Sequence, residues 1–139
     1  MKDDHGHRLQ TFRDKERHQC RVCLKLTEPG ERVLSLAYSP FDRDTAYSEV
    51  GPIFIHERHC TPHRPEDCYP AEFPRHDVVL RAYNEEGKIE DAELVGERVV
   101  EEVIGELLDQ PRVRFIHARN STYGCYMFRI DRSSRSGKD

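Results

Sequence analysis

The chain has 139 residues, which is enough for one domain with its own core, and 35% of them are charged against about 25% in ordinary globular chains. The formal net charge is −4, and a mostly acidic chain lacks the broad basic surface that nucleic-acid binding needs. No apolar run approaches the ~18 residues of a membrane span, and the N-terminus has no apolar signal segment. We therefore expect a cytoplasmic protein that binds neither nucleic acid nor membranes.

Both ends of the chain are polar. Residues 1–19 hold Leu9 and Phe12 among many charged and histidine positions, and residues 132–139 are rich in Ser, Gly and charge. Such segments bury too little apolar surface to order themselves. We therefore predict flexible tails at 1–19 and 132–139 and a single α+β domain at 20–131.

The first half of the domain alternates short apolar segments with turns and loops. Val, Leu and Ile at alternate positions predict strands, and Pro and Gly mark the breaks between them. The expected order is a short extended segment at 20–26, a turn at 28–30, a strand at 33–38, a long connection at 39–51, a strand at 52–57 and an irregular stretch at 59–74.

The second half begins with a hairpin and continues into the one expected helix. Strands at 78–83 and 89–95 flank a turn in which Gly87 supplies the strained position. Residues 97–108 carry apolar side chains at helical spacing with Glu outside, and Pro111 prevents any continuation. The expected core stripe of this helix is Val99, Val100, Val103, Ile104, Leu107 and Leu108.

Residues 111–132 predict a second hairpin around a polar turn at 120–122, because apolar residues alternate on both sides of it. Folding the chain about that turn gives one apolar face with His117 at its end. The layout is a single compact α+β domain, a mostly antiparallel sheet of five or six strands with one main helix. The expected cross-strand pairs are Val113 with Ile130, Phe115 with Phe128, and His117 with Tyr126.

Metal binding is one chemistry that the sequence supports. The chain has five cysteines, an odd number that favours free thiols or metal ligands over a disulfide framework. Zinc takes four Cys or His ligands, but the two ligand pairs here are far apart and no Gly follows Cys23 to shape a turn. The alternative is that the cysteines are core residues and the histidines are solvated. The candidate zinc ligands are Cys20, Cys23, His56, Cys60 and His63.

Thiol catalysis is a second chemistry. Arg21 follows Cys20, and a neighbouring cation lowers a thiol pKa and favours the nucleophilic thiolate. Either Cys20 or Cys125 would then need a histidine base, His56 or His117, brought near by the fold. The alternative is that both are inert buried cysteines.

Binding of an anion or small molecule is the third chemistry and our leading hypothesis from the sequence. Polar residues gather at the ends of otherwise apolar strands, where binding groups usually sit. Arginine offers planar donors for carboxylate or phosphate, although many arginines here will pair with the surplus of Glu and Asp. The candidate ligand-binding residues are Arg21, Tyr47, Glu49, His117, Arg119 and Asn120, with Arg81 as a further donor.

Five blocks of the sequence, taken together and in order, resemble a known bacterial family catalogued as Domain of Unknown Function 1203. The blocks are CRVCL at 20–24, PGERVLSLAY at 29–38, AYSEVGPIFIH at 46–56, LRAY at 80–83 and VRFIHARNSTYGCYMFRI at 113–130. The resemblance implies a compact bacterial domain with no assigned activity. The family-like positions are Cys20, Arg21, Tyr47, Glu49, Gly51, Pro52, His117, Arg119, Asn120, Gly124 and Cys125.

Overall fold

The computed structural model describes residues 10–13, 17–41, 45–64 and 69–132, and the parts of the predicted tails at 1–9 and 133–139 lie outside the described residues. The chain divides into two compact units. Unit 1 comprises Met1–Ser39 and Val50–Phe73, and unit 2 comprises Pro40–Glu49 and Pro74–Asp139. Most of the long connection expected at 39–51 therefore belongs to unit 2. Residues Pro40–Glu49 join that unit before the chain returns to unit 1 at Val50.

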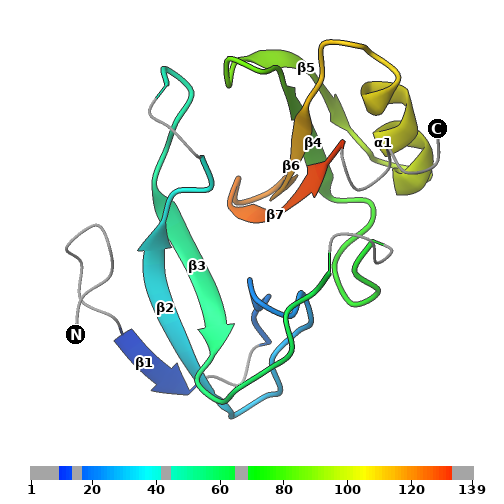
Figure 1. Cartoon of the computed structure of the whole chain (residues 1–139). Helices are drawn as coiled ribbons and strands as arrows, with labels where there is room; N and C mark the ends of the chain where they lie inside the picture. The colour runs from blue at the N-terminus through cyan, green and yellow to red at the C-terminus, as the bar shows by residue number, and fades with distance from the viewer. Residues whose placement is uncertain (1–9, 14–16, 42–44, 65–68, 133–139) are drawn as a thin grey trace. The chain divides into compact units, whose positions relative to one another are not determined.

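Unit 1 is built on a three-stranded antiparallel sheet (Figure 1) in the order β1 (Gln10–Arg13), β2 (Arg32–Tyr38) and β3 (Gly51–His56). β2 and β3 confirm the two predicted strands to within one residue. β1 lies inside the range for which we expect a tail, and it pairs along β2 from Gln10 opposite Ser35 to Arg13 opposite Arg32. Backbone pairing with an existing strand orders a segment whose own composition is polar.

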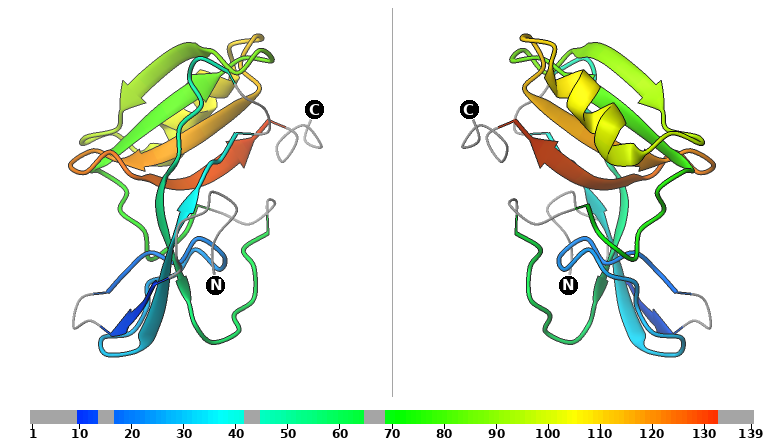
Figure 2. Two further views of the ribbon diagram at one scale, coloured as in Figure 1. Left: turned by 90° about the vertical axis from the view of Figure 1, so that its left-hand side faces the viewer. Right: turned by 90° about the vertical axis from the view of Figure 1, so that its right-hand side faces the viewer.

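Unit 2 contains a four-stranded antiparallel sheet in the order β5-β4-β6-β7 and the helix α1, shown from two sides in Figure 2. The α+β class, the antiparallel pairing and the single main helix are confirmed, but the strands of the described residues form two sheets rather than one. The bounds are β4 Val78–Tyr83, β5 Ile89–Leu94, α1 Val100–Leu108, β6 Phe115–Asn120 and β7 Tyr126–Asp131.

The helix begins later than predicted, at Val100, and Val99 before it is about half exposed. Gly96 has a positive φ of 58°, and Arg98 N donates to Val95 O, so residues 95–98 form a tight turn in place of the first helical turn. The rest of the predicted stripe is buried. Its members are Val100, Val103, Ile104, Leu107 and Leu108.

The two faces of the unit 2 sheet differ in chemistry. Leu80 pairs with Ala118 and Ala82 with Ile116, and all four residues are fully buried. They form an apolar sheet face of the kind that the apolar stripe of a helix covers. Side chains alternate along a strand, so the intervening residues face the other way. That second face carries Arg81, Tyr83, Phe115, His117 and Arg119.

The predicted register of the β6–β7 hairpin is wrong. The loop is longer than the predicted turn, because Asn120 N donates to Cys125 O and Gly124, with φ 76°, closes the chain back on itself. A β-bulge between Ala118 and Arg119 adds a further shift. The observed pairs are Phe115 with Asp131, Ile116 with Ile130, His117 with Arg129, Ala118 with Phe128, and Arg119 with Tyr126.

The helix of unit 2 is short. No helix in the part of the chain that the structure describes is long and apolar enough to cross a membrane.

The packing of α1 gives a stability prediction. Leu107→Ala removes a side chain that is 1% exposed, and the cavity should lower the free energy of unfolding by about 2–5 kcal/mol, as measured by urea denaturation. Glu102→Ala, on the exposed side of the same helix, should change it by about 0.5 kcal/mol or less. Equal effects of the two substitutions would show that the stripe is not core.

Candidate metal centre

Residues 20–24 form a tight turn, so the predicted extended segment at 20–26 is wrong. Cys20 N donates to Lys25 O at 3.0 Å, and Leu24 N donates to Cys20 O at 3.0 Å. Leu24 has φ 56°, in the left-handed region that favours glycine. A metal-binding turn commonly has a glycine after its second cysteine, and none follows Cys23. Leu24 itself adopts the left-handed conformation that such a glycine would supply.

This turn lies against β3, which carries the third candidate ligand. Cys20 bridges to Phe54, and Arg21 N donates to Phe54 O at 2.8 Å. His56 lies two residues further along the same strand and ends it. Parallel pairing at Phe54 thus fixes the distance between the first cysteine and the histidine.

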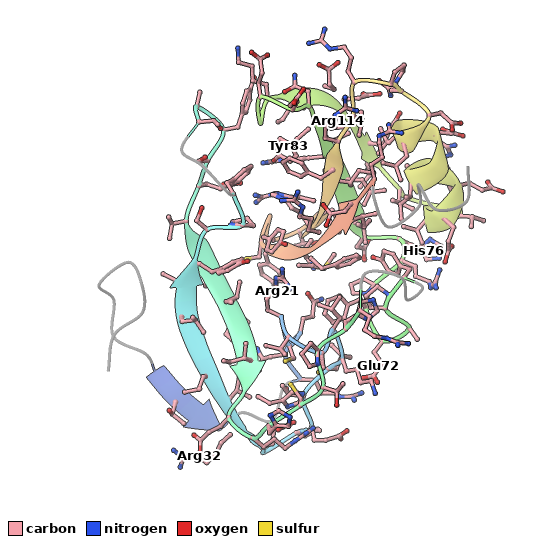
Figure 3. The ribbon with its side chains drawn as sticks, viewed as in Figure 1. Arg21, Arg32, Glu72, His76, Tyr83 and Arg114 are labelled. Atoms are coloured by element: carbon pink, nitrogen blue, oxygen red, sulfur yellow. The ribbon has the colours of Figure 1, made fainter. Side chains whose placement is uncertain are left out.

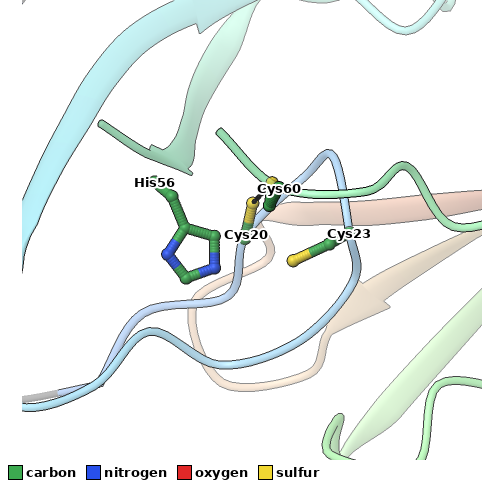
Figure 4. A group of neighbouring side chains, drawn as sticks. All are labelled: Cys20, Cys23, His56 and Cys60. Carbon is green, nitrogen blue, oxygen red and sulfur yellow. Dashed lines mark hydrogen bonds between the residues drawn. The ribbon is translucent and has the colours of Figure 1, made fainter. Parts of the chain in front are cut away.

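The chain after β3 brings a third cysteine to the same place. His63 N donates to Val22 O at 2.9 Å, which ties the returning segment to the turn. The sulfur of Cys60 lies 3.8 Å from the sulfur of Cys20. Three separate stretches of unit 1 therefore meet at one point, as Figure 4 shows.

Cys20, Cys23, His56 and Cys60 are close enough to hold a metal ion, since one ligand atom from each lies within 4.8 Å of all the others. Three of the four are buried and Cys60 is half-buried. A tetrahedral ion with metal–sulfur bonds of about 2.3 Å has sulfur–sulfur edges of about 3.8 Å. The Cys20–Cys60 separation has this length.

The ring of His56 is held in one orientation by a carboxylate. Its Nδ1 donates to Glu31 Oε2 at 2.9 Å, while the buried Nε2 has no hydrogen-bond partner. Glu31 Oε1 accepts from Glu28 N, and Arg58 Nε lies 3.4 Å from Oε2. A carboxylate on one ring nitrogen sets the tautomer that leaves the other nitrogen free to ligate, which is the usual outer shell of a metal-bound histidine.

The carboxyl group of Glu31 is charged in this setting. Burial alone would raise its pKa, but the Glu28 N–H, the His56 ring and Arg58 outweigh burial and hold the pKa below its usual value. The ionised carboxylate then keeps the proton of His56 on Nδ1.

The three thiols differ in how readily they ionise. Burial would raise the pKa of Cys20, but backbone N–H groups of Cys23, His56 and Val22 outweigh it and lower the pKa. Burial raises the pKa of Cys60 to about 12, with a further contribution from Cys20, and burial also raises the pKa of Cys23. The cluster accommodates one thiolate readily, and a second and third need a cation to share the site.

His63 is not among the clustered ligands. Its part in the geometry is the backbone bond to Val22, which positions Cys60 three residues earlier. Glu31, in contrast, was missed from the sequence. It lies 25 residues before His56, and no local pattern links a turn glutamate to a strand-end histidine.

The predicted ligand-binding residues divide between the units. Arg21 belongs to unit 1 and lies over the Tyr38 ring at 5.6 Å from its centroid. Tyr47, Glu49, His117, Arg119 and Asn120 belong to unit 2. Figure 3 labels Arg21 of unit 1 and Tyr83 of unit 2 among the side chains that it draws.

Within unit 2, His117 and Asn120 have different surroundings. His117 is fully buried, and its ring lies 4.9 Å from those of Phe41, Tyr83 and Tyr126. Asn120 Oδ1 accepts from the backbone N–H groups of the two turn residues Thr122 and Tyr123, so it shapes the β6–β7 turn. Both remain predictions as ligand contacts.

The pairs proposed for thiol catalysis also divide. Cys20 and His56 lie together in unit 1, whereas His117 and the half-buried free thiol of Cys125 belong to unit 2. Of the two predicted bases, the one in the same unit as Cys20 is therefore His56, whose Nδ1 is already bonded to Glu31.

Comparison with known proteins places the chain in a family. No curated protein and no solved structure matches it. The model of the family described as "Protein of unknown function (DUF1203)" matches residues 17–132, a range that contains all four clustered ligands. The chain belongs to the DUF1203 family.

Proposed function

We propose that the chain binds one structural zinc ion through Cys20, Cys23, His56 and Cys60. The observation that carries the proposal is the convergence of three sulfurs and one ring nitrogen of His56 within 4.8 Å of one another, in a ring whose buried Nε2 has no hydrogen-bond partner. Soft thiolates with imidazole in a tetrahedral set favour zinc over magnesium or calcium, which prefer oxygen. A reducing cytoplasm would keep the thiols available.

A structural role fits better than a catalytic one. Structural zinc sites have four protein ligands, whereas catalytic sites have three and keep the fourth position for water or substrate. With zinc bound, Cys20, Cys23, His56 and Cys60 would fill all four positions. The N–H groups directed at Cys20 also favour the thiolate that a zinc ion requires.

The packing of unit 1 supports the same role. Among the described residues of unit 1, five buried apolar side chains are larger than cysteine, and one of them, Leu24, belongs to the ligand turn itself. Zinc sites contribute folding free energy directly, about 10–16 kcal/mol in isolated zinc-finger peptides. The described buried apolar residues of unit 1 are Cys20, Cys23, Leu24, Val33, Ile53, Tyr69 and Phe73.

Thiol catalysis receives less support from the same geometry. A nucleophilic cysteine must reach its substrate, yet the side chain of Cys20 is fully buried. A catalytic pair also has no use for two further thiols, and Cys60 lies in contact with Cys20.

Zinc content tests the proposal. Protein purified without a polyhistidine tag should contain about one zinc per chain by elemental analysis. Cys23→Ser should lower that content severalfold and lower the melting temperature, because serine is a poor zinc ligand. Cys125→Ser, which changes a half-buried free thiol of unit 2, should retain full zinc. Zinc near zero in the unmutated protein would end the proposal.

The role of Glu31 gives a second test. Glu31→Gln removes the charge that orients His56, and loss of such a partner lowers metal affinity about 10–100-fold. Competition with a chromophoric chelator should show the weaker affinity with one zinc still bound per chain. Glu57→Gln is the matched control, since Glu57 pairs with Arg32 and should leave the affinity unchanged. Equal affinities for both variants would contradict the assignment of Glu31.

A further inference from the structure

A second group of charged side chains lies in unit 2, on the sheet face opposite the one that carries Leu80, Ala82, Ile116 and Ala118. Arg81 of β4 pairs opposite His117 of β6, and Arg119 lies two residues beyond His117. The two arginines are therefore diagonal neighbours on adjacent strands, within reach of one small ligand. The segment Pro40–Glu49 belongs to the same unit and brings Glu49 to them.

Both arginines bond a single carboxylate oxygen. Glu49 Oε1 accepts from Arg81 Nη1 at 3.3 Å and from Arg119 Nη2. Arg119 Nη1 also donates to Gly124 O at 2.9 Å, which fixes its guanidinium against the β6–β7 turn. The plane of Arg119 is thus set by the turn and does not depend on Glu49 alone.

One donor of Arg119 is left unused. Its side chain is 6% exposed, and Nε is buried without a hydrogen-bond partner. Nε and Nη2 form the edge of a guanidinium that binds two oxygens of an oxyanion side by side. Glu49 supplies one oxygen to that edge, so a buried charged donor is unsatisfied, which is costly.

The charges do not balance either. Among the described residues, Glu49 is the one carboxylate that pairs with Arg81 or Arg119, so these three side chains together carry a net charge of +1. The side chains of Arg81 and Glu49 are 36% and 45% exposed. A ligand from solvent would therefore reach the buried arginine by displacing the partly exposed glutamate.

We propose that Arg81 and Arg119 bind a phosphate group, and that Glu49 holds its place when no ligand is bound. A phosphate carries a charge of about −1.5 to −2 at neutral pH, which matches two arginines once Glu49 has moved away. Two of its oxygens satisfy the Nε–Nη2 edge of Arg119 and a third bonds Arg81. Glu49 lies on a segment without helix or strand structure, so it can swing aside while the two strands stay in place.

The ligand is either free phosphate or a phosphomonoester, because the three oxygens that the arginines contact are common to both. A carboxylate has one negative charge and two oxygens, so it leaves part of the site unsatisfied. This site lies in unit 2 and is independent of the zinc ion proposed for unit 1.

Calorimetric titration in a phosphate-free buffer at low salt tests the proposal. Inorganic phosphate and phosphoserine are titrated into the unmutated chain, into Glu49→Gln, and into Glu49→Gln combined with Arg81→Gln. Glu49→Gln lacks the carboxylate that competes with the ligand. It should therefore bind inorganic phosphate or phosphoserine about tenfold more tightly than the unmutated chain, equivalent to about 1.4 kcal/mol. The added loss of Arg81 should weaken that binding by at least the same factor. If inorganic phosphate binds more tightly, the ligand is free phosphate, and if phosphoserine binds more tightly, it is a phosphomonoester.

The controls separate this site from general charge effects. Arg75→Gln removes an arginine of the same unit that pairs with Glu101, and it should leave phosphate binding unchanged. Arg81 is used in place of the buried Arg119, whose loss could prevent folding. Any of three results would overturn the proposal. Glu49→Gln could bind phosphate no more tightly than the unmutated chain, Arg81→Gln could leave the binding unchanged, or acetate could bind as tightly as phosphate.

Discussion

The left-handed backbone of Leu24 is the constraint on which unit 1 depends. An L-residue with a bulky side chain pays about 1–2 kcal/mol for this conformation. In return the chain reverses within a few residues, which aims the sulfurs of Cys20 and Cys23 at one point and turns backbone N–H groups toward Cys20. Burial of the Leu24 side chain and the Cys20–Lys25 bond offset part of this cost. Under the zinc proposal, the metal offsets the rest.

The two units reach stability by different means. Unit 2 has a continuous apolar layer in which the α1 stripe covers one sheet face, so its packing follows from side-chain volume and hydrophobic burial. Among its described residues, unit 1 has fewer buried apolar side chains than unit 2, and it has the cluster of Cys20, Cys23, His56 and Cys60. The described buried apolar residues of unit 2 are Val78, Leu80, Ala82, Tyr83, Val95, Val100, Val103, Ile104, Leu107, Leu108, Val113, Ile116, Ala118, Met127 and Phe128.

The sequence predicts most strands and the helix because those elements follow from local periodicity. β2, β3, β4 and β5 end within about a residue of expectation, since apolar patterns and Gly or Pro breaks mark them. The apolar pattern does not predict the register of the β6–β7 hairpin. A bulge and a longer loop shift the strand pairing without changing that pattern. The division into two sheets depends on non-local pairing, which periodicity does not report.

The candidate site shows the same limit. All four clustered residues were among the predicted zinc ligands, because Cys and His are distinctive residue types. The roles of His63 and Glu31 do not follow from the sequence. His63 contributes a backbone bond to Val22, and Glu31 contributes a carboxylate that lies far from His56 in the sequence. The turn at Cys20 was missed because Leu24 has no propensity for its conformation.

The excursion of Pro40–Glu49 into unit 2 has a consequence for how the chain folds during synthesis. Proteins emerge from the ribosome N-terminus first, and a contiguous domain can fold as soon as its last residue appears. Here all four residues of the Cys and His cluster have emerged by residue 60, yet the partners of Phe41 and Glu49 appear only with β4 and β6. This segment therefore stays without its partners until strands about 30–75 residues later have been synthesised, and such late closure slows folding.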